Sequence, residues 1–500
     1  MKKYIDVPQY TTLKNIQKNS FTFSATQYKK FNIKNNNKLK VKDFLSRELT
    51  RDDLGVEVGS ESYVDNSDHY FMKTAALQED SNLIDINKES MQSIIPKNFI
   101  KMELKKGDIL ISKDSNVGET AILEKDYPNI MLCGGIYRLP IKEHKYYFLA
   151  FTKNDIFRQQ IDFLVPRGST IRHGKTKFLE CYIPIPNYNK EITMQYVELL
   201  MQAIIDKEII IREKHKEIFR KIENELKNNQ LDNKFKYERP TINNIIKYER
   251  LDTSLYSKEY EYNNFLVKNY KYGYISLTDR GYKGVRGTSL ENNFIKSRID
   301  SDEYIDGFYE LIIPTNISEF GYVKKSSYIG TPVELKTIKK GDIIFGGEGF
   351  GKGRTFVVCE DVKNIATNYH GIRIVNNNHD INDSIFIRCF LAYWREQGMI
   401  DKIGVGGSGG HCAPSYFHLI VTPKFPDEVK KNIVKLYYNN SKYKTDHLNL
   451  SNFLENDHKY NLNAGIYELD KSIKKMKKYL KSVIEKIAND EEVLIDFKEL

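Results

Sequence analysis

One sequence pattern occurs twice in this chain, more than two hundred residues apart. KKGDILISKDSNVGETAIL at 105–123 is matched by KKGDIIFGGEGFGKGRTFVV at 339–358. Further matched blocks follow in the same order: FSATQY (23–28) with LDTSLY (251–256), GGIYRL (134–139) with HGIRIV (370–375), FLAF (148–151) with FLAY (390–393), and RGSTIRHGKTKFLECYIP (167–184) with GGSGGHCAPSYFHLIVTP (406–423). Collinear order over so many blocks indicates an internal duplication, so the chain must fold as two similar parts.

Each copy has the pattern of an α+β unit with a mainly β core. Segments such as DILIS and DIIFG alternate apolar and polar residues and are bounded by Gly, Asn and Asp, which is typical of strands. A helical stretch follows, around Tyr146–Phe163 in the first copy and Ile385–Gln397 in the second. Both copies close with a strand that ends at proline, YIPIP or LIVTP.

A long helical segment follows each copy. Residues 190–229 contain neither Pro nor Gly, and Val197, Ile204, Ile211 and Ile218 recur every seventh residue, although Glu208 and His215 interrupt this face. After the second copy the two apolar heptad positions are occupied by Ile466, Leu469, Ile473, Met476, Leu480, Val483 and Ile487. Such a seam is typical of a coiled coil, and the two helices, in equivalent positions, can pair with one another antiparallel. A single amphipathic helix packed on its own domain would show a similar stripe.

The predicted order is therefore domain, helix, domain, helix. We expect a first domain at 1–189, a central helix at 190–232, a second domain at 233–426, and a helical connector with the last helix at 427–500. Residues 427–463 are longer and more polar than the matching passage at 184–195, which predicts an insertion or a small helical element. A helix of about 35 residues is roughly 50 Å long, a length comparable with the spacing of paired recognition units on DNA.

Composition sets limits on the function. The 77 Lys and Arg exceed the 67 Asp and Glu, and the net charge of +10 favours polyanions without singling out DNA. The five cysteines are scattered and form no C-x-x-C pair, so no zinc or disulfide framework is implied. The N-terminus has no apolar leader and no apolar run approaches the ~20 residues of a membrane span. We expect a soluble, cytoplasmic protein that does not bind a membrane.

The catalytic motifs that we considered are incomplete. GGEGFGKG (346–353) resembles a phosphate-binding loop, but Gly353 stands where that loop needs Ser or Thr, and a strand follows instead of a helix. No proline adjoins another or follows Asn or Asp, which excludes the loop of amino-methyltransferases. Glu334-Leu335-Lys336 fits one element of a nuclease site, without an upstream partner. Because no active site is duplicated with the domains, we expect no catalytic residue and no metal on this chain.

Two glycine-punctuated segments carry side chains that can contact DNA. VPRGSTIRHGKTKF (165–178) is basic, whereas its counterpart GVGGSGGHCAPSYF (404–417) is nearly uncharged. The candidate DNA-binding residues are Lys113, Arg167, Ser169, Thr170, Arg172, His173 and Lys175 in the first copy, and Arg280, Lys283, Arg286, Lys352, Arg354, Ser408, His411 and Tyr416 in the second. Arg can bind guanine bidentately, and Ser, Thr and Lys can reach base edges or phosphates. A solvated basic surface loop is the alternative for each residue.

These features together resemble the specificity (S) subunit of type I restriction–modification systems, over essentially the full chain. The resemblance lies in the two-copy order, the K-K-G-D-I-L/I strand with its loop and G-x-T strand, the G-S-T…Y-I-P-I-P ending and the heptad helices. It implies a phage-defence protein whose two similar target recognition domains each read one half of a split site in double-stranded DNA. It also implies that the antiparallel helices separate the halves and dock two methyltransferase subunits.

The same resemblance implies that the chemistry belongs to partners. Methyl transfer with S-adenosylmethionine, and ATP- and Mg-dependent translocation and cleavage by restriction subunits, would occur outside this chain. Three alternatives stay open at this point: the specificity chain of a type IIB-like restriction–methyltransferase, a nuclease with an unrecognised site, and a coiled-coil scaffold that binds protein only.

Overall fold

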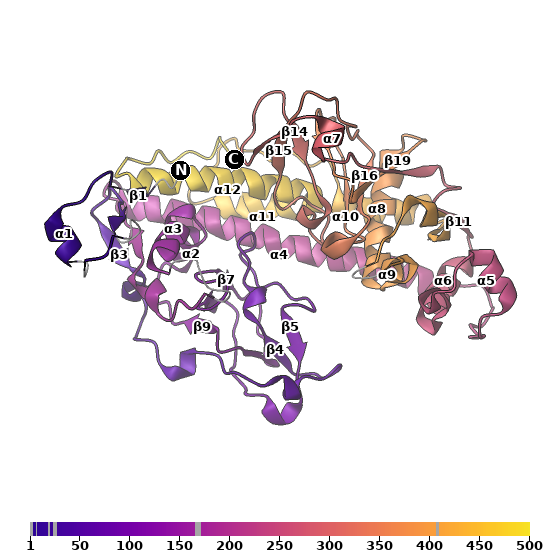
Figure 1. Cartoon of the computed structure of the whole chain (residues 1–500), viewed down its shortest axis with the longest axis horizontal. Coiled ribbons are helices and arrows are strands. Elements are labelled where there is room, and N and C mark those ends of the chain that lie inside the picture. Colours follow the sequence, from indigo (N-terminus) through magenta and orange to yellow (C-terminus); the bar gives the residue numbers. More distant parts are fainter. Residues whose placement is uncertain (1–3, 7, 19–20, 24–27, 166–171, 407–409) are drawn as a thin grey trace. The chain divides into compact units, whose positions relative to one another are not determined.

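The computed structural model describes residues 4–6, 8–18, 21–23, 28–165, 172–406 and 410–500 (Figure 1). The chain divides into two compact units. Unit 1 comprises Met1–Ile209, Tyr443–Lys459 and Lys471–Leu500, and unit 2 comprises Ile210–Lys442 and Tyr460–Asp470. The long helix α4 (Lys190–Asn228) contributes its first part to unit 1 and its second part to unit 2, as does α11 (Phe453–Asn463). Helix α12 (Ile466–Ala488) begins in unit 2 and continues in unit 1.

Among its described residues, unit 1 is built from short strands and three further helices. Its strands are β1 (Ile5–Asp6), β2 (Lys30–Phe31), β3 (Lys38–Lys40), β4 (Tyr70–Met72), β5 (Met91–Ser93), β6 (Ile109–Ser112), β7 (Thr120–Ile122), β8 (Ile130–Leu132), β9 (Ile136–Leu139) and β10 (Tyr182–Pro184). Its helices are α1 (Leu13–Lys18), α2 (Lys145–Thr152) and α3 (Asp155–Leu164). The sheets have the strand orders β7-β6-β9, β5-β4-β8, β10-β3 and β1-β2.

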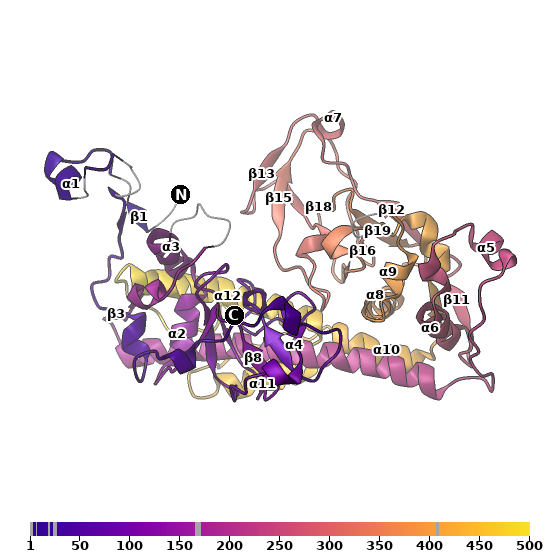
Figure 2. The same cartoon turned by 60° about the horizontal axis from the view of Figure 1, so that its bottom comes forward.

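Unit 2 has the same kinds of element. Its strands are β11 (Tyr274–Ser276), β12 (Tyr282–Arg286), β13 (Ile299–Ser301), β14 (Tyr309–Leu311), β15 (Ser327–Gly330), β16 (Ile343–Gly346), β17 (Thr355–Val357), β18 (Ile365–Ala366), β19 (Gly371–Asn376) and β20 (Val421–Pro423). Its helices are α5 (Ile242–Tyr248), α6 (Lys258–Lys268), α7 (Asn292–Ile295), α8 (Ile381–Glu396), α9 (Met399–Ile403) and α10 (Asp427–Tyr437). Figure 2 shows β12, β16 and β19 as one group and β13, β15 and β18 as another.

The sheets of the two units follow one pattern. The order β7-β6-β9 in unit 1 corresponds to β17-β16-β19 in unit 2, where β12 is added at the edge. In the second sheet, β4 pairs in parallel with β8 and antiparallel with β5, and β14 pairs in parallel with β18 and antiparallel with β15. The matched sequence blocks thus form strands with matched neighbours. The alternation expected for these blocks is not observed, because every residue of β6, β7, β16 and β17 is buried.

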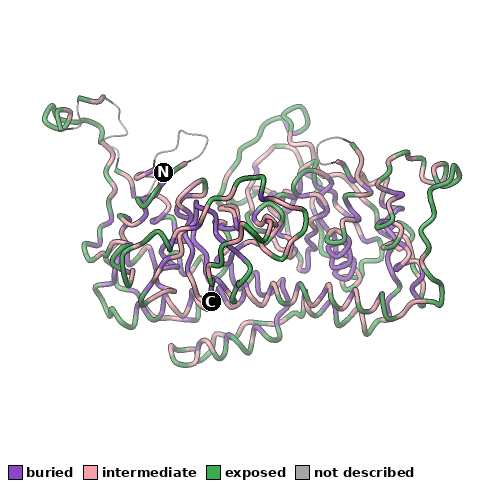
Figure 3. The backbone as a smooth tube through the Cα atoms, turned by 90° about the horizontal axis from the view of Figure 1, so that it is seen from below, coloured by how far each residue is buried: buried purple, intermediate pink, exposed green. Residues whose placement is uncertain are grey.

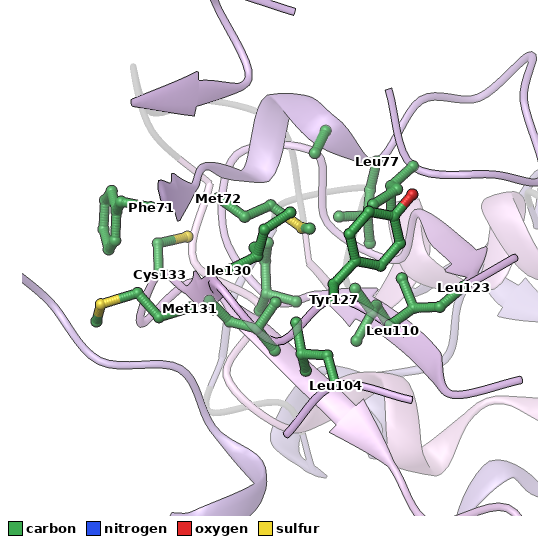
Figure 4. Close-up of a cluster of buried hydrophobic side chains, with 14 of the residues drawn as sticks. Phe71, Met72, Leu77, Leu104, Leu110, Leu123, Tyr127, Ile130, Met131 and Cys133 are labelled. Carbon is green, nitrogen blue, oxygen red and sulfur yellow. The ribbon is translucent and has the colours of Figure 1, made fainter. Parts of the chain in front are cut away.

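Buried apolar residues from these strands form the core of each unit. In unit 1 a cluster joins Leu110 of β6 with Ile130, Met131 and other residues of neighbouring segments (Figure 4). In unit 2 Ile344 and Phe356 belong to a similar cluster. Complete burial of one such side chain contributes about 1.5–3 kcal/mol to folding, so the clusters explain why the apolar positions of the blocks are retained in both copies.

The KKGD sequence before β6 and β16 forms the same turn twice. The carboxylate of Asp108 accepts a hydrogen bond of 2.9 Å from the backbone N–H of Lys105, and Asp342 accepts one of 2.7 Å from that of Lys339. The glycine within each turn has a positive φ, 84° and 85°, which a residue without Cβ adopts at no cost. Local turn chemistry therefore requires both the Gly and the Asp.

The structure confirms the helical stretch predicted around Tyr146–Phe163. Two helices occupy this stretch, α2 and α3, because the side chain of Asn154 caps a new helix by accepting a hydrogen bond of 3.0 Å from the backbone N–H of Ile156. In unit 2, α8 begins at Ile381, before the predicted start at Ile385, since Asp380 caps it. The connector at 427–463 contains two helices, α10 and α11.

The long helix α4 buries the predicted apolar face. Val197, Ile204, Ile211 and Ile218 are buried, as are the seven predicted heptad residues from Ile466 to Ile487. Within unit 1, the amide of Asn189 donates to Glu492 (3.2 Å) and Lys477 forms an ion pair with Glu208 (2.8 Å). In this part of unit 1, α4 and α12 therefore run in opposite directions.

The two polar residues that interrupt the apolar face of α4 have specific partners. The carboxylate of Glu208 accepts hydrogen bonds of 2.9 Å from the backbone N–H and the side-chain amide of Asn82, besides its ion pair with Lys477. In unit 2, the buried ring of His215 packs on Phe219 and Phe320, with ring centroids 4.3 and 5.2 Å away. Burial lowers the pKa of His215 to about 3, so this imidazole is neutral at physiological pH.

A buried ion pair joins α4 to α11 inside unit 1. The ammonium of Lys207, fully removed from solvent, contacts the buried carboxylate of Asp457, which also accepts a hydrogen bond of 2.7 Å from the hydroxyl of Tyr443. Burial lowers the pKa of Lys207, and the nearby carboxylate opposes this effect. A buried charge requires its partner, so this pair specifies how the two helices align.

Candidate nucleic-acid interface

In unit 1 the loop after β6 is held against the segment that begins at Arg172. The backbone N–H of Lys113 donates to the carbonyl of Gly135 (2.8 Å), and its carbonyl accepts from the N–H of Gly174 (2.7 Å). Asp114 and His173 form an isolated antiparallel bridge beside these bonds. Backbone hydrogen bonds therefore fix the relative positions of two segments that lie far apart in the sequence.

The side chains of that bridge form a carboxylate–imidazole pair. Nδ1 of His173 lies 2.8 Å from Oδ1 of Asp114, and the ammonium of Lys113 lies 2.6 Å from Oδ2. An ionised carboxylate only accepts hydrogen bonds, so Nδ1 carries the proton. Because the imidazole is largely exposed, Nε2 is left to contact an external group: as an acceptor when the ring is neutral, and as a donor when it is charged.

Unit 2 contains the same arrangement after β16. The backbone N–H of Gly347 donates to the carbonyl of His370 (2.9 Å), and its carbonyl accepts from the N–H of Cys412 (2.7 Å). Glu348 and His411 form an isolated antiparallel bridge, as Asp114 and His173 do in unit 1. The two loops therefore share one backbone scaffold and carry an acid followed by a distant histidine at the same positions.

The carboxylate of Glu348 contacts two exposed imidazoles, those of His370 and His411, each through Nδ1. Partial burial raises the pKa of Glu348, but the hydrogen bond from His370 and the charges of His370, His411 and Arg286 outweigh this effect, so the pKa lies below its usual range. Glu348 is thus an anion that orients two imidazoles toward solvent.

Aromatic rings stack on two arginines of unit 2, Arg286 and Arg250. The guanidinium of Arg286 lies over the ring of Tyr369, 4.6 Å from its centroid, and donates to the carbonyl of the same residue (3.3 Å). Arg250 lies over the ring of Tyr416 at 4.8 Å and forms an ion pair with Asp252 (2.6 Å). Stacking holds the guanidinium plane of Arg286 in place while leaving N–H donors at its edge. Arg250 differs, because its side chain is buried and donates to Asp252 and to the carbonyls of Ile403 and Gly404.

Several predicted DNA-binding residues form contacts within their own unit. Arg280 binds both carboxylate oxygens of Asp383, at 2.9 and 2.5 Å, and is largely buried. Arg172 donates to the carbonyl of Val165 and pairs with Asp162 (3.0 Å). Arg354 donates to the carbonyls of Thr315 and Ile317, and Lys352 pairs with Asp401 (2.8 Å). These contacts occupy donors that the sequence pattern alone had left available for DNA.

The remaining predicted residues fall into two groups. Lys175, which has a positive φ of 49°, and Lys283 on β12 are exposed. Arg167, Ser169, Thr170 and Ser408 lie outside the described residues.

Sequence reasoning missed Asp114, Glu348, His370, Tyr369 and Arg250. A usable signal existed for the first two, because an acid occurs in the loop after both KKGD strands. The histidine partner of each acid is distant in sequence, so only the fold associates them.

The described part of the chain contains no group of three or more His, Cys, Asp or Glu side chains placed to hold a metal ion. All five cysteines are free and buried. Among the helices that the structure describes, none combines the length and the apolar character needed to cross a bilayer.

Comparison with known proteins gives similarity to solved structures only; no family model and no curated protein matches the chain. One similar structure is the S subunit of a type I restriction–modification system from M. genitalium, with 12% identity over 92% of this chain and 97% of that chain and a TM-score of 0.40. The HsdS subunit from Thermoanaerobacter tengcongensis has 11% identity over 91% and 96%, with a TM-score of 0.26.

A third similar chain belongs to a structure that describes complex assembly and conformational transition of the type I restriction–modification system, with 11% identity over 90% of this chain and 97% of that chain and a TM-score of 0.28. The named solved structures to which this chain is similar are thus specificity (S) subunits of type I restriction–modification systems, the family that its sequence resembles.

Proposed function

We propose that this chain is the sequence-specific DNA-binding specificity subunit of a type I restriction–modification complex. One observation carries the proposal: the pairs Asp114–His173 and Glu348–His411 occupy the same positions on the same backbone scaffold, while the side chains around them differ. A duplicated scaffold with different exposed chemistry suits two domains that recognise different sequences. The recognition domains would be residues 1–189 and 233–426, each reading one half of a bipartite site.

The oriented side chains suit base recognition. With Nδ1 bound to a carboxylate, Nε2 of a neutral His173 or His411 can accept a hydrogen bond from the amino group of adenine or cytosine. Arg286, supported by Tyr369, can donate to guanine N7 and O6. The exposed Lys175 and Lys283 are suited to phosphate contacts, which set position and affinity without sequence preference.

The helices would set the distance between the two half-sites. In this proposal α4 and α12 pair as an antiparallel coiled coil through the predicted apolar residues, and the coil docks two methyltransferase subunits. S-adenosylmethionine would be bound by those subunits, and ATP and Mg by restriction and translocase subunits, so this cytoplasmic chain would catalyse nothing itself. The support from the structure is the burial of every predicted heptad residue and the opposite direction of the two helices in unit 1.

A domain exchange tests the proposal. Replacing residues 240–425 by the same segment of a related chain should alter one half of the methylated motif and leave the other half unchanged, measured by sequencing methylated genomic DNA with and without the exchange. A change in both halves, or in neither, contradicts the assignment of one domain to one half-site. Purified parent chain should also bind duplex DNA with an affinity that falls steeply as salt increases.

The spacer function has its own test. Removing whole helical turns at matched positions of α4 and α12 should change the number of base pairs between the two half-sites and leave their sequences unchanged. A change in the half-site sequences with an unchanged spacer would contradict the role of the helices.

A further inference from the structure

The proposed function uses only one side chain, that of Glu348, from the glycine-rich segment GGEGFGKG (346–353). This segment begins at the end of β16, and Gly349–Gly351 form a short 3-10 turn directly after Glu348. Phe350, in the middle of the turn, is 83% exposed. Surface loops of both units are coloured mainly as exposed or intermediate in Figure 3, and one exposed apolar residue is ordinary on a protein surface. What distinguishes Phe350 is the loop that holds it.

Backbone contacts define the conformation of this loop. The N–H of Gly353 donates to the carbonyl of Gly346 (2.8 Å), and the N–H of Lys352 donates to the carbonyl of Gly349 (3.0 Å). A Cβ on Gly346 would lie 1.9 Å from the carbonyl oxygen of Gly351, so no other residue fits there without a shift of the chain. The loop is therefore a closed turn that joins β16 to β17.

Two basic side chains anchor the loop to neighbouring segments. Arg354 donates to the carbonyl of Ile317 (3.1 Å), and the ammonium of Lys352 pairs with Asp401 (2.8 Å). Both basic residues are predicted DNA contacts, but in the structure these bonds hold the C-terminal end of the loop. They thereby fix the turn that carries Phe350.

The turn lies beside groups that are proposed to contact DNA. The carboxylate of Glu348, immediately before the turn, contacts the exposed imidazoles of His370 and His411. The bridge between Glu348 and His411 fixes the backbone on that side of the turn. Phe350 is thus held two residues from a carboxylate that orients two imidazoles. Its ring has neither a hydrogen-bond donor nor an acceptor, so it can meet a base only by stacking or by edge contact.

The equivalent loop of unit 1, residues 114–118, carries no aromatic side chain. The amide of Asn116 donates to the carbonyl of Leu77 (3.2 Å), and Val117 is buried. These contacts turn the loop of the first copy toward its own unit. The exposed ring is therefore a feature of the second copy, and its effect should be confined to the half-site that the second domain reads.

We propose that Phe350 inserts its ring into the base stack of bound DNA, at a base-pair step in or beside the half-site that the second domain reads. The inference rests on the proposed function and adds a residue that recognises the shape and flexibility of the DNA. Apolar side chains that enter between base pairs, Phe and Leu among them, partly unstack the step and kink the duplex by about 20–90°. Pyrimidine–purine steps unstack most easily, so the second half-site should favour one at this position.

The surroundings of the ring favour DNA over a protein partner. The residues next to Phe350 in the chain are glycines, and the half-exposed ring of Tyr369 is covered on one face by the guanidinium of Arg286 (4.6 Å). A protein interface depends on a cluster of buried anchors rather than on one side chain. A gap in a base stack takes a single ring, and imidazoles and a guanidinium are suited to bases and phosphates.

The test measures the bending and unstacking of DNA. The full-length chain, assembled with the methyltransferase subunits of the same host, is bound to a duplex that carries the methylated motif and a donor and an acceptor dye at its two ends. In a second set of duplexes, 2-aminopurine replaces one base at a time in the second half-site and its flanks, where loss of stacking raises its fluorescence. We expect the parent to bring the dyes closer together and to raise the fluorescence at one step.

Phe350→Ala should lose both signals and bind the duplex about tenfold more weakly. Phe350→Leu should keep most of both signals, because leucine also acts as a wedge. Phe294→Ala, at a 63% exposed position on α7 of the same unit, is the matched control and should behave as the parent does. Exchanging the unstacked pyrimidine–purine step for a purine–purine step should weaken binding by the parent more than binding by Phe350→Ala.

Three results would overturn the inference: a Phe350→Ala complex that bends and unstacks DNA as the parent does, a parent complex whose DNA is straight and fully stacked, or a Phe350→Ala chain that binds DNA normally but loses methyltransferase subunits in native mass spectrometry. Circular dichroism checks the fold of each variant. Failure of the proposed function appears separately, as a parent chain that shows neither salt-dependent DNA binding nor an effect on the methylated motif. The inference fails alone when the parent passes those tests and Phe350 affects neither the bend nor the stacking.

Discussion

Nδ1 of His173 lies 2.8 Å from Oδ1 of Asp114, although the two residues are 59 positions apart. In the second unit His411 contacts Glu348 in the equivalent place. Two copies of the chain that have diverged at most positions thus keep an acid that orients an exposed imidazole. In the proposed function, the imidazoles rather than the buried arginines are therefore the main oriented groups that would contact DNA.

Asp114→Asn should weaken binding to the half-site read by the first domain. An amide no longer requires the proton on Nδ1, so the imidazole loses its fixed tautomer and orientation. We expect the affinity for duplexes carrying the methylated motif to fall about tenfold, the value of one good base contact. Glu348→Gln should, for the same reason, weaken binding to the half-site read by the second domain.

Fluorescence anisotropy with duplexes altered in one half at a time measures the effect. Asp52→Asn, a change of an exposed acid in the same unit, should leave affinity unchanged. Equal discrimination against both halves in the Asp114→Asn variant would argue against an oriented reading group.

His215 should make the stability of unit 2 depend on pH. Its pKa is lowered from about 6.5 to about 3 by burial, with smaller effects from Arg388 and Arg395. Between these values the unfolded chain takes up a proton that the folded chain does not. The contribution of neutral His215 to the free energy of unfolding is therefore fully present above pH 6.5. It decreases as the pH falls toward 3, by about 1.4 kcal/mol per pH unit at most.

Urea unfolding monitored between pH 7 and 4 measures this slope. His215→Leu should remove most of it, whereas His379→Leu, at an exposed position of the same unit, should keep it. A His215→Leu protein with the parent's pH dependence would contradict the assignment.

Removing one partner of the buried pair between Lys207 and Asp457 should strongly destabilise unit 1. Lys207→Met leaves the buried carboxylate of Asp457 without its cation, which costs about 3–5 kcal/mol. The double variant Lys207→Met/Asp457→Leu removes both charges and should recover most of the loss. Chemical unfolding of the four proteins in a double-mutant cycle gives the interaction energy, and a double variant as unstable as the sum of the single changes would show that the charges act independently.

Arg280 should act on folding more than on DNA. Asp383→Asn replaces one carboxylate oxygen by an NH2 donor and removes the negative charge, so Arg280 loses its bidentate anionic partner and one oxygen is left for the donors of Arg280 and Tyr282. The pKa of Asp383 is raised by burial but lowered overall by Arg280, so the carboxylate is charged at neutral pH. We expect a loss of about 3 kcal/mol in the free energy of unfolding.

A thermal melt measures the effect of Asp383→Asn. Arg298→Met, which breaks an exposed ion pair with Asp300, serves as the control. It should change the free energy of unfolding derived from the melt by less than about 1 kcal/mol. If Asp383→Asn melted like the parent and instead altered DNA affinity, Arg280 would be a DNA contact after all.

The sequence by itself determined the duplication, the strand blocks and the long helices. These features depend on residue periodicity and on turn residues, which are local properties of the chain: both KKGD segments, at 105–108 and 339–342, form the same turn before a strand. The burial of Val197, Ile204, Ile473 and Leu480 follows from the seven-residue repeat for the same reason.

Only the tertiary structure decided which polar side chains are available. An arginine in a basic, glycine-punctuated segment has the same sequence signature whether it faces solvent or pairs internally. Arg280 pairs internally because the turn that precedes β12 places it beside Asp383 on α8. Likewise Asp114 meets His173, and Lys207 meets Asp457, because the fold brings distant segments together. Contacts of this kind depend on the path of the whole chain, whereas periodicity depends on neighbouring residues alone.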